Sequence, residues 1–309
     1  MNRGRLAILI ATPSKLAWKP AIERVLPEAD VHVWPDSPDD VDFALVWKPP
    51  GDLFERVRVR RAIMNLGAGV DALFELPTLP SDVSLLRITD AGMATQMAEY
   101  VTLAVLRAYR EQDAYAESQR NARWQPRKRL AKSEFSVGFL GVGVLASAVA
   151  RALKPFEFPL LGWRRSAQPA EAIEVFAPDA LDRMLARTRV LVVMLPLTGQ
   201  TRGIVDGRML RALPRGSHLV NVARGPLVVE QDLLDALDDG HLASATLDVF
   251  DEEPLPSTHR FWHHPKIVIT PHVSAVTLLD ESAEQVAAKL RAFVRGEPVD
   301  GIVDRKRGY

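Results

Sequence analysis

The most informative absence in this 309-residue sequence is cysteine. Without a thiol, the chain can form no disulfide framework, thiolate metal site, thiol nucleophile or redox switch. An excess of charge of one sign is also lacking, because 39 Lys and Arg residues balance 39 Asp and Glu residues. This balance excludes the electrostatic footprint of a general nucleic-acid binder. Any chemistry must therefore come from His, Arg and carboxylate side chains.

Long apolar runs are missing too. No run approaches the ~20 residues that cross a bilayer, and the run at 6–11 is too short for the hydrophobic part of a secretion signal, so we expect a cytoplasmic protein. The composition that remains is that of a globular protein, with 47% hydrophobic and 25% charged residues. At ~150 residues per domain, the length predicts about two domains.

The first part of the chain alternates short apolar runs with segments rich in Pro and charge, which predicts strands and short helices. The runs are 6–10, 31–34, 43–47, 62–66 and 84–88. Residues 93–118 lack Pro and Gly and carry apolar side chains at helical spacing, which predicts one long helix between two domains. The basic segment 119–133 has the composition of an exposed loop. Its charge fits either a solvated surface or an anion-binding role.

After residue 134 the pattern becomes a regular alternation of apolar strands and amphipathic helices. The expected strands are 135–140, 158–163, 190–195, 217–222, 243–249 and 267–270, and the expected helices are 146–154, 180–186, 206–213 and 230–238. The middle strands are apolar on both faces, as a parallel sheet covered by helices requires. Six strands with crossover helices predict a doubly wound α/β domain. A last helix is expected between 274 and 295, and if it returns to the first domain, that domain is discontinuous.

A glycine-rich turn lies between the first strand and the first helix of that domain. Residues 141–146 read Gly-Val-Gly-Val-Leu-Ala, a Gly-x-Gly-x-x-Ala motif in the context that binds dinucleotides. Gly141 permits the tight turn, Gly143 lets a pyrophosphate approach the backbone, and Ala146 lets the helix pack closely. The helix N-terminus offers N–H groups to the anion. The residues expected at the cofactor here are Gly141, Gly143, Val144 and Leu145.

The end of the second strand distinguishes the two nicotinamide dinucleotides. NAD sites normally place Asp or Glu there, whereas a 2′-phosphate is repelled by a carboxylate and attracted by Arg. This sequence has Arg164, Arg165 and Ser166 instead. The pattern favours NADPH over NADH. The alternative is that the arginines merely cap a strand at a wet surface.

Polar residues that follow later strands predict the catalytic groups, because ligands lie beyond the carboxyl ends of a doubly wound sheet. Arg224, Glu253 and His272 occupy such positions. A guanidinium can bind a carboxylate with two parallel hydrogen bonds, and a protonated imidazole can give a proton to a carbonyl oxygen that gains charge as hydride arrives. A neighbouring carboxylate stabilises the imidazolium. The set suits reduction of a 2-oxo acid, although each residue alone also has an ordinary structural explanation.

These motifs, in this order, resemble the D-isomer-specific 2-hydroxyacid dehydrogenase family over essentially the whole chain. The segments that carry the resemblance are 66–71, 141–146, 195–198, 221–225, 247–254 and 270–272. Segments 46–50, 163–166 and 303–309 are similar to those of members that reduce glyoxylate and hydroxypyruvate. The usual third glycine of the turn is Ala146 here, which narrows the turn slightly.

The resemblance implies two Rossmann-like doubly wound α/β domains. Residues 1–95 and 276–309 would form a discontinuous, flavodoxin-like substrate domain, and 96–275 an inserted NADP-binding domain. It also implies a homodimer that reduces small 2-oxo acids with NADPH, with NADH as a possible substitute. Glyoxylate would give glycolate, and hydroxypyruvate would give D-glycerate.

The resemblance implies further site residues as well. Backbone N–H groups of Ala68, Gly69 and Val70 would hold the substrate carboxylate, and Trp47 would line the substrate side. Alternatively, the glycine-containing segment at 68–70 is an ordinary turn between a strand and a helix, and Trp47 is an aromatic residue of the core. Residues expected near the nicotinamide are Leu195, Pro196, Thr201, Val222, Ala223, Arg224, Asp248 and His272, of which Arg224 and His272 also touch substrate. No metal is expected, because His263 and His264 are adjacent and lack helical metal-site spacing.

A second hypothesis comes from another class of protein. A non-catalytic, corepressor-like sensor would bind the nucleotide through the same glycine turn and respond by changing its partners. Such a sensor needs no proton donor. The presence of Arg224, Glu253 and His272 favours the enzyme.

Overall fold

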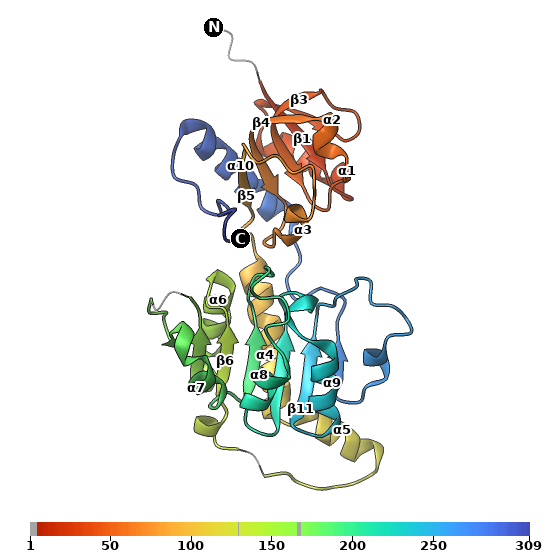
Figure 1. Ribbon diagram of the computed structural model, residues 1–309, viewed down its shortest axis with the longest axis vertical. Coiled ribbons are helices and arrows are strands. Elements are labelled where there is room, and N and C mark those ends of the chain that lie inside the picture. Colours follow the sequence, from red (N-terminus) through yellow and green to blue (C-terminus); the bar gives the residue numbers. More distant parts are fainter. Residues whose placement is uncertain (1–4, 129, 166–167) are drawn as a thin grey trace. The chain divides into compact units, whose positions relative to one another are not determined.

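The computed structural model describes residues 5–128, 130–165 and 168–309. The chain divides into two compact units (Figure 1), Met1–Met93 with Thr277–Tyr309 as unit 1, and Ala94–Val276 as unit 2. Unit 2 is therefore an insertion in the sequence of unit 1. Each unit contains one parallel sheet, and the predicted class of two doubly wound α/β domains is confirmed.

Unit 1 has five strands in the order β2-β1-β3-β4-β5. The strands are β1 Leu6–Ala11, β2 Ala29–Val33, β3 Asp40–Val46, β4 Arg58–Asn65 and β5 Ser84–Arg87, and the helices are α1 Lys15–Val25, α2 Leu53–Arg56, α3 Asp71–Phe74 and α10 Leu279–Arg295. The chain starts on an inner strand, adds β2 on one side and then continues on the other. This is the flavodoxin-like order.

The last part of the chain completes unit 1. Helix α10 packs against α1, and Arg291 of α10 donates a hydrogen bond to Glu28 at 2.8 Å. Further on, the N–H of Val303 donates to the carbonyl of Leu85 in β5 at 2.9 Å, and the Val303 side chain belongs to the core. The core of this unit is thus built from both ends of the sequence.

Unit 2 has seven strands in the order β12-β11-β10-β9-β6-β7-β8. The strands are β6 Val137–Leu140, β7 Leu160–Trp163, β8 Glu174–Phe176, β9 Val190–Val193, β10 Ser217–Asn221, β11 Leu242–Leu247 and β12 Ile267–Ile269. The helices are α4 Met93–Tyr109, α5 Gln112–Arg120, α6 Val144–Leu153, α7 Leu181–Leu185, α8 Gly207–Ala212 and α9 Glu230–Asp238. Its described residues also form the short 3-10 turns η1 Lys132–Glu134, η2 Lys154–Phe156, η3 Pro178–Ala180, η4 Gly225–Leu227 and η5 Arg260–His263. The strand order reverses between β6 and β9. Ligands of such sheets bind beyond the strand ends at this reversal.

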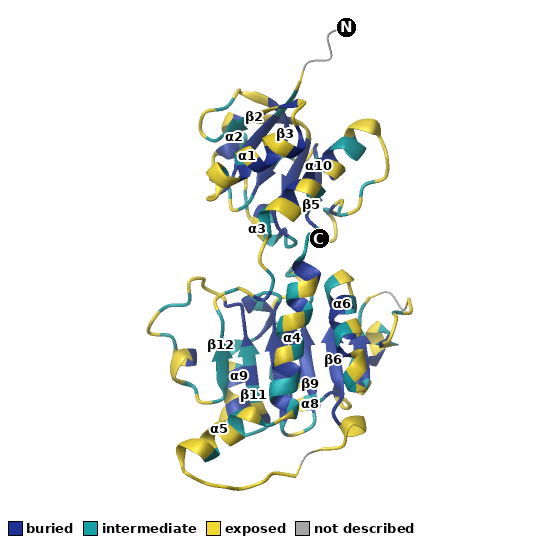
Figure 2. Cartoon of the chain, turned by 180° about the vertical axis from the view of Figure 1, so that it is seen from behind, coloured by how far each residue is buried: buried dark blue, intermediate teal, exposed yellow. Residues whose placement is uncertain are grey.

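Alternation along the strands explains the two layers of helices in unit 2. Val190 and Val192 of β9 face the core made with α4 and α6, whereas Leu191 and Val193 face the core made with α7, α8 and α9. Successive strand residues point to opposite faces, so a continuous apolar run is needed when both faces are covered. Figure 2 shows the strands of this sheet mostly as buried.

The structure corrects the predicted helix over 93–118. It is two helices, α4 and α5, separated at Arg110 and Glu111, where Glu111 adopts a left-handed backbone with φ of 52°. The ion pair between Arg107 and Asp113 bridges this break. The apolar stripe ends with α4, because α5 has no buried residue. A helix with no buried side chain has little packing to keep it in line with the helix before it, and no Pro or Gly in the sequence marks the break.

The structure also adds a strand, β8 Glu174–Phe176, that the sequence did not reveal. It lies at the sheet edge beside β7 and is only three residues long, too short to show a period. Segment 121–128 is exposed throughout, as Figure 2 shows by its yellow trace. In the described part of the chain, no helix has the length and apolar character needed to cross a membrane.

Candidate active site

The glycine turn after β6 has the shape that the motif predicts. Gly141 has φ of 97°, and a Cβ there would lie 2.8 Å from the carbonyl oxygen of Met194 at the end of β9. Only glycine fits this left-handed position against a neighbouring backbone. A Cβ at Gly143, in contrast, would meet no atom within 4 Å. The turn is thus closed toward the sheet and open on the side from which an anion can approach.

Helix α6 starts directly after Gly143. Its first residue, Val144, is 59% exposed, so the N-terminal turn is accessible, while Ala146 is buried in the core shared with Phe139 of β6. The N–H groups of a first helical turn have no partners within the helix and attract anions. The residues present therefore fit a bound pyrophosphate.

The two arginines after β7 have different surroundings. The Arg164 side chain donates to the carbonyl of Val142 in the glycine turn at 3.2 Å and to that of Pro169 at 3.3 Å, and it also contacts the carbonyl of Gln168. Arg165 is exposed. Ser166, the third residue predicted here, lies outside the described residues. Arg164 thus ties the strand end to the glycine turn.

The loop after β9 is closed by Thr201. Its hydroxyl donates to the carbonyl of Pro196 at 2.6 Å and accepts from the N–H of Thr198 at 2.8 Å. Leu195 and Pro196 remain partly exposed. This places three predicted cofactor residues in one loop at the strand reversal.

The segment after β10 carries Arg224. Buried Asn221 donates to the carbonyl of Arg224 at 2.9 Å and accepts from the N–H of Ala223 at 3.2 Å. A Cβ on Gly225 would lie 2.0 Å from the backbone of Phe250, so the loop passes too close to the next strand end for any side chain. Arg224 is therefore held on both sides by fixed backbone. Its own Nη1 donates to the carbonyl of Ala223 at 2.7 Å.

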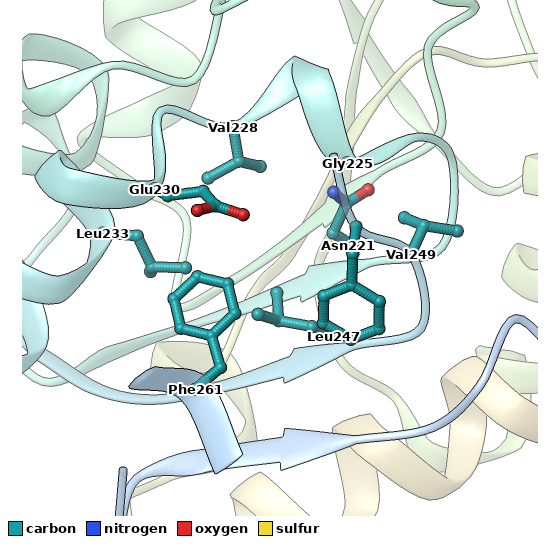
Figure 3. Close-up of a pocket in the computed structure, with 9 residues that line it drawn as sticks. Asn221, Gly225, Val228, Glu230, Leu233, Leu247, Val249 and Phe261 are labelled. Atoms are coloured by element: carbon teal, nitrogen blue, oxygen red, sulfur yellow. The ribbon is translucent and has the colours of Figure 1, made fainter. Parts of the chain in front are cut away.

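Figure 3 shows a small pocket behind this loop. Its walls are Asn221, Gly225, Val228, Glu230, Leu233, Leu247, Val249, Phe250 and Phe261. The carboxylate of Glu230 is paired with His259 at 3.2 Å. The pocket is lined partly by the loop that carries Arg224, so its apolar walls and this paired charge pack against that loop. The side chains predicted to be catalytic are not among the residues that line it.

His272 and Glu253 are in direct contact. The Nδ1 atom of His272 lies 2.7 Å from Oε2 of Glu253, and the other carboxylate oxygen accepts from the N–H of Phe250 at 3.1 Å. The His272 side chain is 38% exposed and that of Glu253 26%. Because Nδ1 is engaged by a carboxylate, Nε2 is the ring nitrogen through which a ligand can exchange a proton.

The backbone of His272 is fixed by Asp248, which is fully buried. The Asp248 carboxylate accepts from the N–H groups of Val273 at 2.9 Å and Ser274 at 2.8 Å, and from the hydroxyl of Thr270 at 2.5 Å. His272 itself has φ of 55°. Such a conformation is costly for a side-chain residue and persists only where the surroundings enforce it.

Two residues of this network were not predicted from the sequence. Thr270 lies directly before the Pro-His pair, and its hydroxyl is 2.6 Å from that of Tyr100 on α4. Burial raises the pKa of the Tyr100 hydroxyl, an effect that the hydrogen bond with Thr270 opposes. The position of Thr270 directly after β12 is a signal in the sequence that could have predicted its place at the site. Tyr100 looked like any other residue of an amphipathic helix.

In unit 1 the structure brings together Trp47 and the turn at 67–70. A Cβ on Gly67 would lie 2.3 Å from Cζ3 of Trp47, so the indole packs directly on this turn while remaining partly exposed. The carbonyls of the turn are held by Asn65 and Arg87, neither of which was predicted. Among the described residues, no group of three or more His, Asp or Glu side chains is arranged to hold a metal.

Comparison with known families shows a specific match in unit 2. Residues 102–274 match the model described as D-isomer specific 2-hydroxyacid dehydrogenase, NAD binding domain. Over 299 residues, the chain is 42% identical to glyoxylate/hydroxypyruvate reductase A of Klebsiella pneumoniae (strain 342), with 94% of this chain and 96% of that protein covered.

Solved structures give the same result over both units. The D-isomer specific 2-hydroxyacid dehydrogenase of Xanthobacter autotrophicus Py2, in complex with NADPH and MES, has a TM-score of 0.92 and 38% identity, with 99% of this chain and 100% of that chain covered. An NADPH-dependent glyoxylate/hydroxypyruvate reductase of Sinorhizobium meliloti, in complex with NADP and sulfate, has a TM-score of 0.92 and 34% identity, with 98% and 100% covered.

Proposed function

The chain belongs to the D-isomer-specific 2-hydroxyacid dehydrogenase family, which makes it an NAD(P)-dependent oxidoreductase, and from that premise we propose that it reduces small 2-oxo acids with NADPH. Glyoxylate would give glycolate, and hydroxypyruvate would give D-glycerate. The observation that carries the proposal is the 2.7 Å contact between His272 and Glu253 at the strand ends of a nucleotide-binding sheet. A sensor has no need for such a proton donor.

The chemistry divides among three side chains. Bound NADPH supplies the hydride for the carbonyl carbon. Arg224 binds the carboxylate of the 2-oxo acid and polarises its carbonyl. His272, protonated, gives its Nε2 proton to the oxygen that becomes the hydroxyl, and then takes a proton from solvent. Glu253 holds the imidazole through Nδ1 and thereby leaves Nε2 for the substrate.

The cofactor preference rests on the end of β7. It carries two arginines and no carboxylate, and relatives of known structure were solved with NADPH or NADP. We assign the 2′-phosphate mainly to exposed Arg165, whereas Arg164 keeps the glycine turn in place through Val142. Charge-assisted hydrogen bonds from Arg to phosphate are strong and specific. NADH, which lacks this phosphate, would bind less tightly.

The loops around the nicotinamide would be built by Leu195, Pro196, Thr201, Val222 and Ala223. Asp248 acts here through the backbone, because its carboxylate accepts the N–H groups of Val273 and Ser274. It thereby fixes the turn that presents His272. In unit 1, Trp47 and the N–H groups of Ala68, Gly69 and Val70 would bind the substrate.

We also propose that the protein is a homodimer, as the family resemblance implies. The exposed hydrophobics include Trp124, at 98% exposure. A large apolar side chain with this exposure adds buried apolar area if a partner copy covers it. Light scattering should give twice the mass of the chain, and Trp124→Ser should shift the mass toward the monomer. The cytoplasmic location stays a prediction that cell fractionation tests.

Purified protein with NADPH and either glyoxylate or hydroxypyruvate tests the function directly. We expect NADPH absorbance to fall only when a 2-oxo acid is present, and the product of hydroxypyruvate to be the D isomer of glycerate. NADPH binding without turnover of any small 2-oxo acid would contradict the proposal and favour the nucleotide sensor.

A further inference from the structure

Two polar side chains end neighbouring strands in unit 1. Asn65 is the last residue of β4 and Arg87 the last residue of β5, and the two are directly paired in the sheet register. Asn65 is 2% exposed, and Arg87 is half-buried. These are the positions at which a doubly wound sheet places its ligand-directed groups, yet neither side chain is used by the proposed chemistry.

Both side chains donate to the turn that follows β4. The amide nitrogen of Asn65 donates to the carbonyls of Gly67 and Gly69, each at 2.8 Å. The guanidinium of Arg87 donates to the carbonyl between them, that of Ala68, at 3.0 Å. Three consecutive carbonyls are therefore held by side chains from the sheet.

Peptide geometry then decides where the N–H groups of the turn point. In a planar trans peptide, the carbonyl of one residue and the N–H of the next point in opposite directions. Holding the carbonyls of residues 67–69 thus directs the N–H groups of Ala68, Gly69 and Val70 away from Asn65 and Arg87. Among the described residues, none accepts a hydrogen bond from these three N–H groups. A row of such N–H groups is a binding surface for an anion.

Arg87 also adds charge to this arrangement. Its guanidinium is always cationic, and a charge-assisted hydrogen bond to a carbonyl polarises the whole peptide group. The N–H of Gly69, at the other end of that peptide, becomes a stronger donor. A second cation lies behind Arg87, because buried Lys289 donates to the Arg87 carbonyl at 3.0 Å.

We propose that Asn65 and Arg87 are positioning residues for a carboxylate subsite formed by the N–H groups of residues 68–70. Asn65 fixes the direction of the N–H groups of Ala68 and Val70. Arg87 fixes the N–H of Gly69 and polarises it through the carbonyl of the same peptide, without touching the ligand. The inference rests on the proposed function, since the carboxylate is that of the 2-oxo acid. The proposal predicts that the positive charge of Arg87, which does not touch the substrate, sets the affinity of the protein for the substrate.

Arg87→Met tests the role of the charge, and Arg305→Met is the matched control. Arg305 lies in the same unit and donates to the carbonyls of Pro80 and Val83 at 2.6 and 2.7 Å, away from the turn. The measurements are KM for glyoxylate, the inhibition constant of oxamate (an unreactive carboxylate of similar shape), kcat, the Kd of NADPH and the melting temperature.

We expect Arg87→Met to raise KM and the oxamate inhibition constant together by about tenfold, because the N–H of Gly69 loses both its fixed direction and the polarisation that the guanidinium provides. Because the subsite binds ground state and transition state alike, kcat should stay within about threefold. The Kd of NADPH should not change. Arg87→Lys, which keeps a cation but not the planar donor, should recover part of the loss.

Arg305→Met should leave both constants unchanged at a comparable loss of melting temperature. Equal changes in the two variants, or an unchanged oxamate constant in Arg87→Met, would overturn the proposal and leave Arg87 as a purely structural residue.

Asn65→Ser provides a second route if Arg87→Met does not fold. The serine hydroxyl is too short to reach either carbonyl, so KM and the oxamate constant should again rise together, and unchanged values would also overturn the proposal. Failure of the proposed function is separate, because in that case the unaltered protein would itself not reduce glyoxylate.

Discussion

The two units are built on similar parallel sheets, but they present their functional groups in different ways. In unit 2 the groups are side chains that follow the strands, with His272 fixed by Glu253 and Asp248. In unit 1 the side chains at the strand ends, Asn65 and Arg87, turn back onto the chain and leave backbone N–H groups to face outward.

Under the proposed function, this difference follows from the task of each unit. A reaction that moves a proton needs a titratable side chain, whereas a carboxylate that is only held can be bound by main-chain N–H groups. Substitutions should therefore act in opposite ways. In unit 2 the side chain that faces the ligand matters most, and in unit 1 the side chain behind the turn matters most.

The largest effect should come from His272→Ala. Loss of the proton donor should lower kcat by about 10²- to 10⁴-fold, while the Kd of NADPH stays nearly the same, because the glycine turn is untouched. Steady-state kinetics and cofactor titration give both values. His264→Ala, which removes an imidazole paired with Asp238, is the control. A parallel loss of turnover and cofactor binding would point to misfolding rather than chemistry.

The next largest effects are expected at Arg164 and Arg165 after β7, whose substitutions should change the binding of the two cofactors differently. Arg165→Ser should weaken NADPH binding by about tenfold or more and change NADH binding little, since only NADPH carries the 2′-phosphate. Arg164→Ser should weaken both cofactors, because Arg164 holds the glycine turn at Val142. Fluorescence titration with each cofactor measures the four constants. If Arg165→Ser weakened NADH as strongly as NADPH, the phosphate would not be bound there.

A smaller effect on stability is expected from pH through His218 of unit 2. Burial lowers the pKa of His218 to about 4 from an ordinary value of 6.5, and its ring accepts or donates a hydrogen bond with Ser244 at 2.8 Å. The unfolded chain then binds a proton more readily than the folded one. Stability from this group is present above the ordinary pKa and is lost as pH falls toward about 4.

Denaturant unfolding at a series of pH values measures this loss. Between neutral pH and about one pH unit below the ordinary histidine pKa, His218 should cost about 1 kcal/mol of unfolding free energy. The His218→Gln variant should lose that part of the slope. A slope equal to that of the unaltered protein would show that another group causes the acid sensitivity.

The smallest effect should be that of Ala68→Ser in unit 1. The substitution keeps the backbone N–H and the three carbonyl contacts of the turn, so KM for glyoxylate should change by no more than about twofold. Together with the Arg87 variants, this measures how far binding depends on the main chain. A large rise in KM would mean that the side chain at this position contacts the substrate.

The sequence was sufficient for the fold of unit 2 because its information is local. Apolar runs on both strand faces, the 141–146 turn and the Gly240 stop after α9 each have one favourable structure. The break at Glu111 and the edge strand β8 were not predictable in this way. Both depend on tertiary contacts, the loss of a packing partner for α5 and the pairing of three residues with β7.

For the candidate site, strand-end positions in unit 2 predict Arg224, Glu253 and His272, and the structure brings His272 and Glu253 into contact. Strand-end positions in unit 1 would also have predicted Asn65 and Arg87. What no pattern could show is the direction of those side chains. Whether a strand-end arginine faces a ligand or its own backbone depends on the path of the next turn, and that path becomes visible only in three dimensions.

The way in which Val303 and α10 complete unit 1 has a consequence for biosynthesis. A ribosome makes all of unit 2 before it makes residues 277–309, so unit 2 can fold while the chain is still growing. Until residues 277–309 are made, the surface of unit 1 that α10 covers in the folded protein stays exposed to water. Truncations or fusions within residues 277–309 should therefore damage unit 1, most of which is translated before unit 2.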